Sequence, residues 1–97
     1  MKRSKKTEQT VAERGKVYGA PIPNMRNIGK MMTGLLNQHY GINLPHDVPP
    51  DVVALIMVLV KINRSVNGIY HPDNFVDLDA YAGFAEEHQK DVQKKID

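Results

Sequence analysis

The sequence predicts an all-α protein, a small helical bundle of about four helices that forms an oligomer. Apolar residues recur at spacings of three and four in several segments, as on one face of a helix, and no segment alternates as a strand does. The connectors between these segments are short and contain proline and glycine, which favours antiparallel packing of neighbouring helices.

The first half of the chain predicts two helices. One is expected at residues 7–18, and a second opens near Asn24, a good N-cap. Gly41 follows the second helix at the position where a left-handed residue commonly ends one. Two interior glycines, Gly29 and Gly34, indicate either close approach of another backbone or a tolerated cost. The apolar stripe of this helix consists of Met25, Ile28, Met32, Leu35, Leu36 and either His39 or Tyr40.

The second half predicts two more helices. The third is expected from Pro50 to Val66 and is apolar on nearly every face. Such a helix is surrounded by other helices or is used partly for self-association. Three other helices in so small a domain cover it poorly, so we expect a homo-oligomer. The fourth is expected from Asp73, as its N-cap, to about Lys95, with an inner stripe of Val76, Ala80, Tyr81, Phe84, Ala85, His88 and Val92.

Length and charge are those of one small globular domain. The 97 residues carry a net charge of +2, and much of the positive excess lies in MKRSKK at the start. We therefore divide the chain into a basic flexible tail, 1–6, and a single helical domain, 7–97. The longest apolar run, Val52–Val60, has nine residues, whereas a membrane span needs about 20. We expect neither a membrane nor a nucleic acid as partner, and the absence of cysteine indicates the cytoplasm.

Charged residues gather where the third helix ends and the fourth begins. Lys61 and Arg64 lie three residues apart in the last turns of the third helix, and Asp73, Asp77 and Asp79 lie at the start of the fourth. If these helices pack antiparallel, Lys61 and Arg64 meet Asp77. The cluster then either stabilises the hairpin and its helix ends or holds a phosphate, which the donor fork of an arginine suits.

A ligand site would also draw on the segment ERGKVYGAPIPNMRNIGK. It offers cations, a tyrosine that could stack on a base and an asparagine that could bind a base edge, although it contains no P-loop motif. The candidate ligand-binding residues are therefore Arg14, Lys16, Tyr18, Asn24, Arg26, Lys61, Arg64, Asp77 and Tyr81.

No motif predicts a metal centre or a catalytic nucleophile. The chain has no cysteine, and its four histidines show no ligand spacing. The tripeptide HPD at 71–73 is typical of a turn. We therefore expect no catalytic residue and no cofactor, with magnesium entering only together with a bound nucleotide.

Three blocks of the sequence, in this order, resemble a group of small phage and prophage proteins. The blocks are ERGKVYGAPIPNMRNIGKMMTGLL, VALIMVLVKINR and HPDNFVDLDAYAGFAEE. The pattern is approximately R-G-x-x-Y-G-x-x-x-x-N, an apolar helix ending K-x-x-R, and D-x-x-V-D-x-x-x-Y. By position it includes Tyr18, Gly19, Asn24, Lys61, Arg64, Asp77 and Tyr81.

That group is distantly similar to nucleotide-modification-associated phage domains and to all-α pyrophosphohydrolases of the MazG and dimeric dUTPase type. The resemblance implies a helical bundle that builds its site between protomers and binds a nucleotide phosphate. Those enzymes hold magnesium with an E-E-x-x-E helix facing an E-x-x-D pair. Here the corresponding helix, Val52–Val60, contains no acid, which favours binding over catalysis.

The leading hypothesis is a phage-type, non-catalytic protein that binds a nucleotide or cyclic nucleotide. In the host cell cytoplasm it would sequester a nucleotide-derived defence signal. One alternative is a magnesium-dependent pyrophosphohydrolase-like enzyme or a nucleotide-modification accessory enzyme. Another is an inhibitor of a host protein, or a structural subunit, that acts by protein–protein contact through the exposed side of the third helix.

Overall fold

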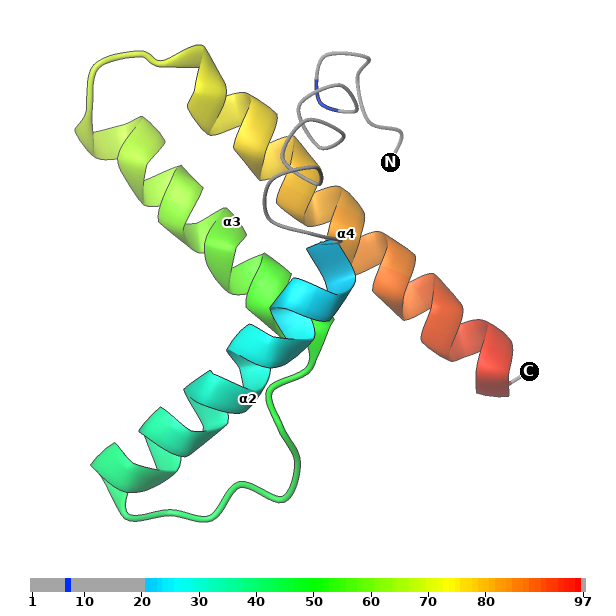
Figure 1. The fold of residues 1–97 in the computed structure, drawn as a ribbon. Coiled ribbons are helices and arrows are strands. Elements are labelled where there is room, and N and C mark those ends of the chain that lie inside the picture. The colour runs from blue at the N-terminus through cyan, green and yellow to red at the C-terminus, as the bar shows by residue number, and fades with distance from the viewer. Residues whose placement is uncertain (1–6, 8–20, 97) are drawn as a thin grey trace.

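The computed structural model describes Thr7 and residues 21–96. These residues form three helices, α2 (Pro21–Tyr40), α3 (Pro50–Asn67) and α4 (Pro72–Ile96) (Figure 1). The described part of the chain contains no strand, so the all-α prediction is confirmed there. The helix predicted at 7–18, Thr7 excepted, and the tail predicted at 1–6 lie outside the described residues. No described helix is both long enough and apolar enough to span a membrane.

Helices α3 and α4 form an antiparallel hairpin, and α2 diverges from it (Figure 1). The most extensive interface joins α3 to α4, and α2 packs mainly on α3. The predicted antiparallel packing of the last two helices is therefore confirmed, whereas the three described helices do not close into a bundle. The core that joins them is small and consists of Met25, Val53, Ala54, Ala80, Phe84 and Ala85.

Helix α2 begins earlier than its sequence predicts. We expected Asn24 as the cap and the two preceding prolines as connector, but the helix begins at Pro21. Pro21 and Pro23 fit there because the first amides of a helix have no partner within it. The end of α2 agrees with the prediction: Gly41 has a φ of +62°, and the amide of Ile42 donates to the Asn37 carbonyl at 3.2 Å, as in a Schellman motif.

The buried side of α2 is only partly the predicted stripe. Met25 is buried and Met32 packs against the core, as expected. Ile28, Leu35 and the ring pair of His39 and Tyr40 are exposed instead. The core side is completed by Gly29 and Thr33, which an apolar periodicity does not mark.

Gly29 and Thr33 hold the connector between α2 and α3. A Cβ at Gly29 would overlap the carbonyl oxygen of Val48, so of the two alternatives for this glycine the structure shows the close approach of another backbone. Gly34 has no such neighbour. The Thr33 hydroxyl donates to the Gly29 carbonyl at 2.7 Å and accepts from the Val48 amide at 2.8 Å.

Helices α3 and α4 nearly match their predicted bounds. Helix α3 extends one residue beyond the expected Val66, and α4 begins at Pro72. The cap predicted at Asp73 is wrong, because the preceding His71 takes that role: its Nδ1 accepts the Asp73 amide hydrogen at 3.3 Å. On α4, the predicted Ala80, Phe84 and Ala85 are buried, while Val92, farther along the helix, is exposed.

Candidate functional site

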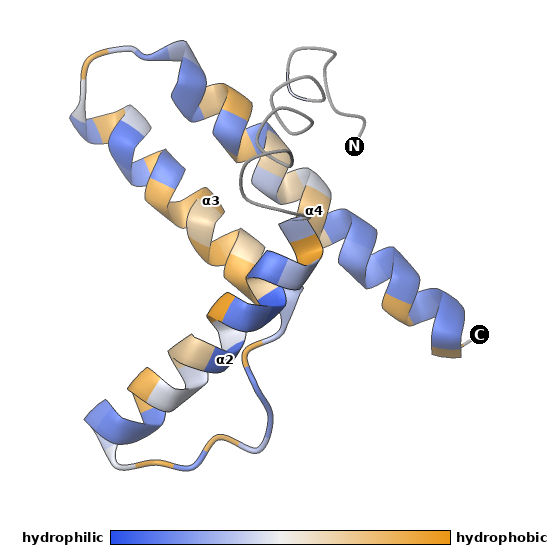
Figure 2. Cartoon of the chain, in the orientation of Figure 1, coloured by the Kyte–Doolittle hydropathy of each residue, from blue (hydrophilic) through white to orange (hydrophobic). Residues whose placement is uncertain are grey.

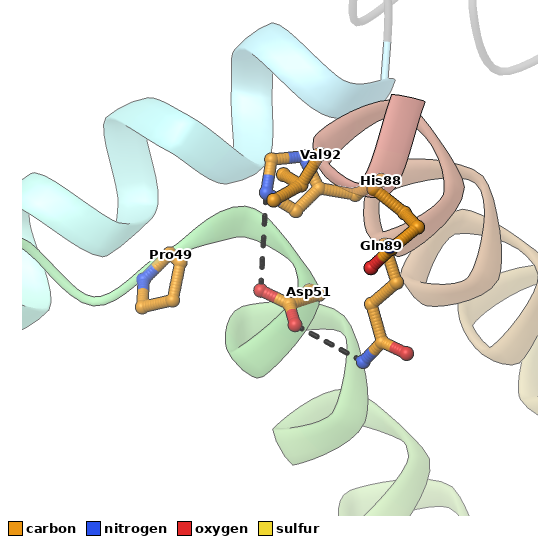
Figure 3. Close-up of a pocket in the computed structure, with 6 residues that line it drawn as sticks. Pro49, Asp51, His88, Gln89 and Val92 are labelled. Carbon is orange, nitrogen blue, oxygen red and sulfur yellow. Dashed lines mark hydrogen bonds and ion pairs between the residues drawn. The ribbon is translucent and has the colours of Figure 1, made fainter. Parts of the chain in front are cut away.

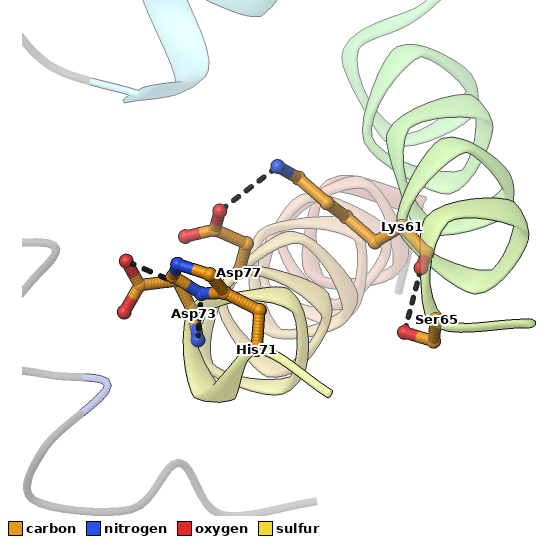
Figure 4. Close-up of polar contacts among 5 residues, drawn as sticks. All are labelled: Lys61, Ser65, His71, Asp73 and Asp77. Atoms are coloured by element: carbon orange, nitrogen blue, oxygen red, sulfur yellow. Dashed lines mark hydrogen bonds and ion pairs between the residues drawn. The ribbon is translucent and has the colours of Figure 1, made fainter. Parts of the chain in front are cut away.

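A buried ion pair joins α3 to α4 at the place where the sequence predicts a charged cluster. Lys61 Nζ lies 2.9 Å from Asp77 Oδ2, and the two side chains are 10% and 7% exposed (Figure 4). The antiparallel hairpin brings them together, because Lys61 lies near the end of α3 and Asp77 near the start of α4. The predicted contact between these residues is confirmed.

Burial decides what this pair can do. The carboxylate of Asp77 compensates the charge of the Lys61 ammonium. Displacing that carboxylate would leave the ammonium buried without its counter-ion. The pair therefore links the two helices, and an incoming anion would have to compete with Asp77 for Lys61. Ser65 lies one turn further along α3 and donates its hydroxyl hydrogen to the Lys61 carbonyl at 2.8 Å (Figure 4).

Arg64 does not join the pair, which corrects the prediction that it would meet Asp77. Within the part of the chain that the structure describes, Arg64 is exposed and forms no ion pair. A spacing of three residues turns a side chain about 60° around the helix from Lys61. That rotation points Arg64 away from α4. Its guanidinium is therefore exposed and keeps its hydration.

The other two predicted aspartates have separate contacts. Asp79 Oδ2 accepts a hydrogen bond from the Thr7 hydroxyl at 2.7 Å. Asp73 is exposed and lies beside His71 (Figure 4). No three His, Asp or Glu side chains among the described residues gather as ligands of a metal ion.

The remaining described candidates lie on two helices, Asn24 and Arg26 on α2 and Tyr81 on α4. Tyr81 packs against the core, and its ring meets Phe84 edge-on with centroids 6.1 Å apart. Asn24 and Arg26 lie in the first turns of α2, the former half-buried and the latter exposed. The other three, Arg14, Lys16 and Tyr18, lie outside the described residues.

A cavity that the sequence did not predict opens between the start of α3 and the second half of α4 (Figure 3). Its volume is about 410 Å³. Asp51 accepts a hydrogen bond from Gln89 at 3.1 Å, and its other oxygen lies 3.9 Å from His88 Nε2. Val92 and Pro49 add apolar surface. The antiparallel pairing of the last two helices could have predicted this cavity, because it places the first turn of α3 beside the polar residues His88 and Gln89.

Fold and contacts define a class: an all-α protein with a buried ion pair in an antiparallel hairpin. The chain belongs to a family described as a domain of unknown function (DUF6378), whose model matches residues 4–89. It is 35% identical over 74 residues to the Gene 55 protein of Mycobacterium phage D29, a match covering 76% of this chain and 44% of that protein. With the Gene 55 protein of Mycobacterium phage L5 it shares 45% identity over 40 residues, 41% of this chain and 26% of the relative.

The chain therefore spans less than half the length of these two curated relatives. No solved structure matches it. The predicted resemblance to phage proteins is confirmed by these relatives, and the more distant likeness to nucleotide-handling families stays a proposal.

Proposed function

We propose that this chain is a phage-type, non-catalytic protein that binds a nucleotide or cyclic nucleotide. The observation that carries the proposal is the exposed guanidinium of Arg64, which has no ion-pair partner in the described part of the chain. It lies one turn from the buried Lys61–Asp77 pair, which fixes the end of α3 against α4. A guanidinium without a carboxylate partner can offer its donor fork to a phosphate.

Binding without turnover agrees with how the carboxylates are used. Two-metal hydrolysis needs carboxylates that converge on ions about 4 Å apart. Here Asp77 pairs with Lys61, Asp79 accepts from Thr7, and Asp51 accepts from Gln89. Stoichiometric binding would suffice to sequester a nucleotide-derived defence signal in the host cytoplasm, with magnesium present only on the bound nucleotide.

Titration calorimetry tests this proposal with the full chain and a panel of mono-, di- and cyclic nucleotides. We expect one ligand to bind and Arg64→Gln to weaken it about tenfold to hundredfold, as for one charge-assisted hydrogen bond. The matched control is Lys95→Gln, which removes an exposed cation at the far end of α4 and should leave binding unchanged.

Three outcomes would overturn the proposal. If no nucleotide binds, or if Arg64→Gln binds as tightly as the control, Arg64 does not form a nucleotide site. Magnesium-dependent turnover of a nucleotide by the wild-type chain would favour the pyrophosphohydrolase-like alternative instead.

Protein–protein contact is a second candidate function, and the exposed apolar side chains of α2 favour it. Met31 and Leu35 are 67% and 69% exposed, and side chains of this kind that lie on one surface mark interaction sites. A host-protein partner that binds there would copurify with the wild-type chain and with Arg64→Gln, but not with Leu35→Asp. Copurification that Leu35→Asp leaves intact would exclude this surface.

A further inference from the structure

One face of α3 is apolar and uncovered. We define the α3 stripe as Val52, Leu55, Leu59, Ile62 and Val66, residues that are between 38% and 75% exposed. Their spacings of three, four, three and four are those of the seam between two paired helices. The buried residues of α3, which pack against the other helices, lie on its other side. Figure 2 shows that most of α3 is hydrophobic, whereas the last turns of α4 are hydrophilic.

The three described helices leave this stripe uncovered, because α2 diverges from the α3–α4 hairpin and the core that joins the helices is small (Figure 1). A second copy of the same stripe would remove these apolar side chains from water in both chains at once.

We propose that the α3 stripe pairs with the α3 stripe of a second copy, antiparallel across a two-fold axis near Leu59. Leu59 lies seven residues from both Val52 and Val66. In this arrangement Leu59 therefore faces itself, and each Val52 faces a Val66, as a self-complementary interface requires.

Charge does not oppose this pairing. Of the residues that flank the stripe, Ile56, Val58, Asn63 and Ser65 are uncharged, and Asp51, beside Val52 at one end, carries a charge. In the antiparallel arrangement the two Asp51 side chains lie at opposite ends of the interface, so two copies can approach without like-charge repulsion at its centre. The pairing is independent of nucleotide binding, since Arg64 is not part of the stripe.

Sedimentation equilibrium of the full chain tests the pairing. We expect a dimer for the wild-type chain and, for Leu59→Asn, a dissociation constant raised about hundredfold or more, because the change occurs twice at the centre of the interface. The control is Ile42→Asn, an exposed apolar residue of the connector after α2 that lies outside the stripe. A wild-type chain that stays monomeric, or a dimer that Leu59→Asn leaves intact, would overturn the proposal.

Disulfide formation provides a second test that does not require a polar residue in the stripe. The chain has no cysteine, so Leu59→Cys introduces a single thiol beside the proposed axis. Mild oxidation should convert this variant to a covalent dimer, while Ile42→Cys should form no disulfide between the two chains. Equal cross-linking of the two variants, or none in Leu59→Cys, would contradict the antiparallel pairing.

Discussion

At the scale of single residues, the Lys61–Asp77 pair links α3 to α4 beyond the end of their small apolar core. Neither residue is exposed enough for water to screen the interaction as it would on the surface. A buried pair of this kind adds little compared with apolar residues of the same shape, but removing one partner leaves an uncompensated charge. We therefore expect the pair to contribute more to the specificity of the hairpin than to its stability.

Lys61→Met is expected to lower the free energy of unfolding by about 3 kcal/mol, because the buried carboxylate of Asp77 loses its contact with the Lys61 ammonium. Urea denaturation followed by circular dichroism measures this loss. The double variant Lys61→Met/Asp77→Leu should recover most of it. Lys95→Met, at an exposed site, should stay within about 0.5 kcal/mol of the wild type. A loss below about 1 kcal/mol in Lys61→Met would show that the pair is dispensable.

The Lys61–Asp77 contact followed from the sequence, while the position of Arg64 did not. Antiparallel helices joined by a short turn must bring the end of one beside the start of the next, and that was enough for Lys61 and Asp77. For Arg64 the same argument allows either contact with α4 or exposure. The choice depends on the rotation of α3 against α4, which side-chain packing decides and residue spacing does not.

At the scale of elements, the connector before α3 is held by backbone groups rather than by apolar side chains. The Val48 carbonyl lies where a Cβ at Gly29 would be, and the Val48 amide donates to Thr33. Helix α2 thus uses a glycine and a threonine to approach the connector closely. The sequence suggested this for Gly29 but equally for Gly34, since both lie inside the same helix.

Gly29→Ala and Gly34→Ala should change stability in opposite directions. At Gly29 the new methyl group meets the Val48 backbone, and the connector must shift, at an expected cost of about 2 kcal/mol or more. At Gly34 nothing lies within 4 Å, so the higher helix propensity of alanine should stabilise by up to about 1 kcal/mol. Thermal unfolding of the two variants under the same conditions measures both effects. A Gly29→Ala chain as stable as Gly34→Ala would contradict the close approach.

Helix ends show why some boundaries were predictable. Gly41 ends α2 with a left-handed φ, which few residue types other than glycine adopt. A glycine at this place is therefore a sequence signal for the end of the helix. Asn24 and Asp73 were chosen as caps because their side chains suit that role, but Pro21 and Pro72 begin the helices. A polar side chain that can cap is common near a helix start, so its presence does not fix the first residue.

At the scale of the whole molecule, the sequence shows that α3 is apolar but does not show which faces of α3 the other helices bury. Periodicity shows which side chains avoid water, and for α3 it marks nearly all of them. It does not show that α2 diverges and leaves the α3 stripe exposed. If two copies pair through the α3 stripe as proposed, this association contributes directly to the stability of the chain.

The midpoint of thermal unfolding should therefore depend on protein concentration. A dimer that dissociates as it unfolds gains about 1.4 kcal/mol of stability for each tenfold rise in concentration. With the average unfolding entropy of two chains of this length, that gain corresponds to about 3 °C. Calorimetry of the wild type at two concentrations tenfold apart measures the shift. Leu59→Asn should remove the shift, while Ile42→Asn keeps it. A midpoint that does not move in the wild type would mean that each chain unfolds alone, and the exposed α3 stripe would then be a surface for a different protein.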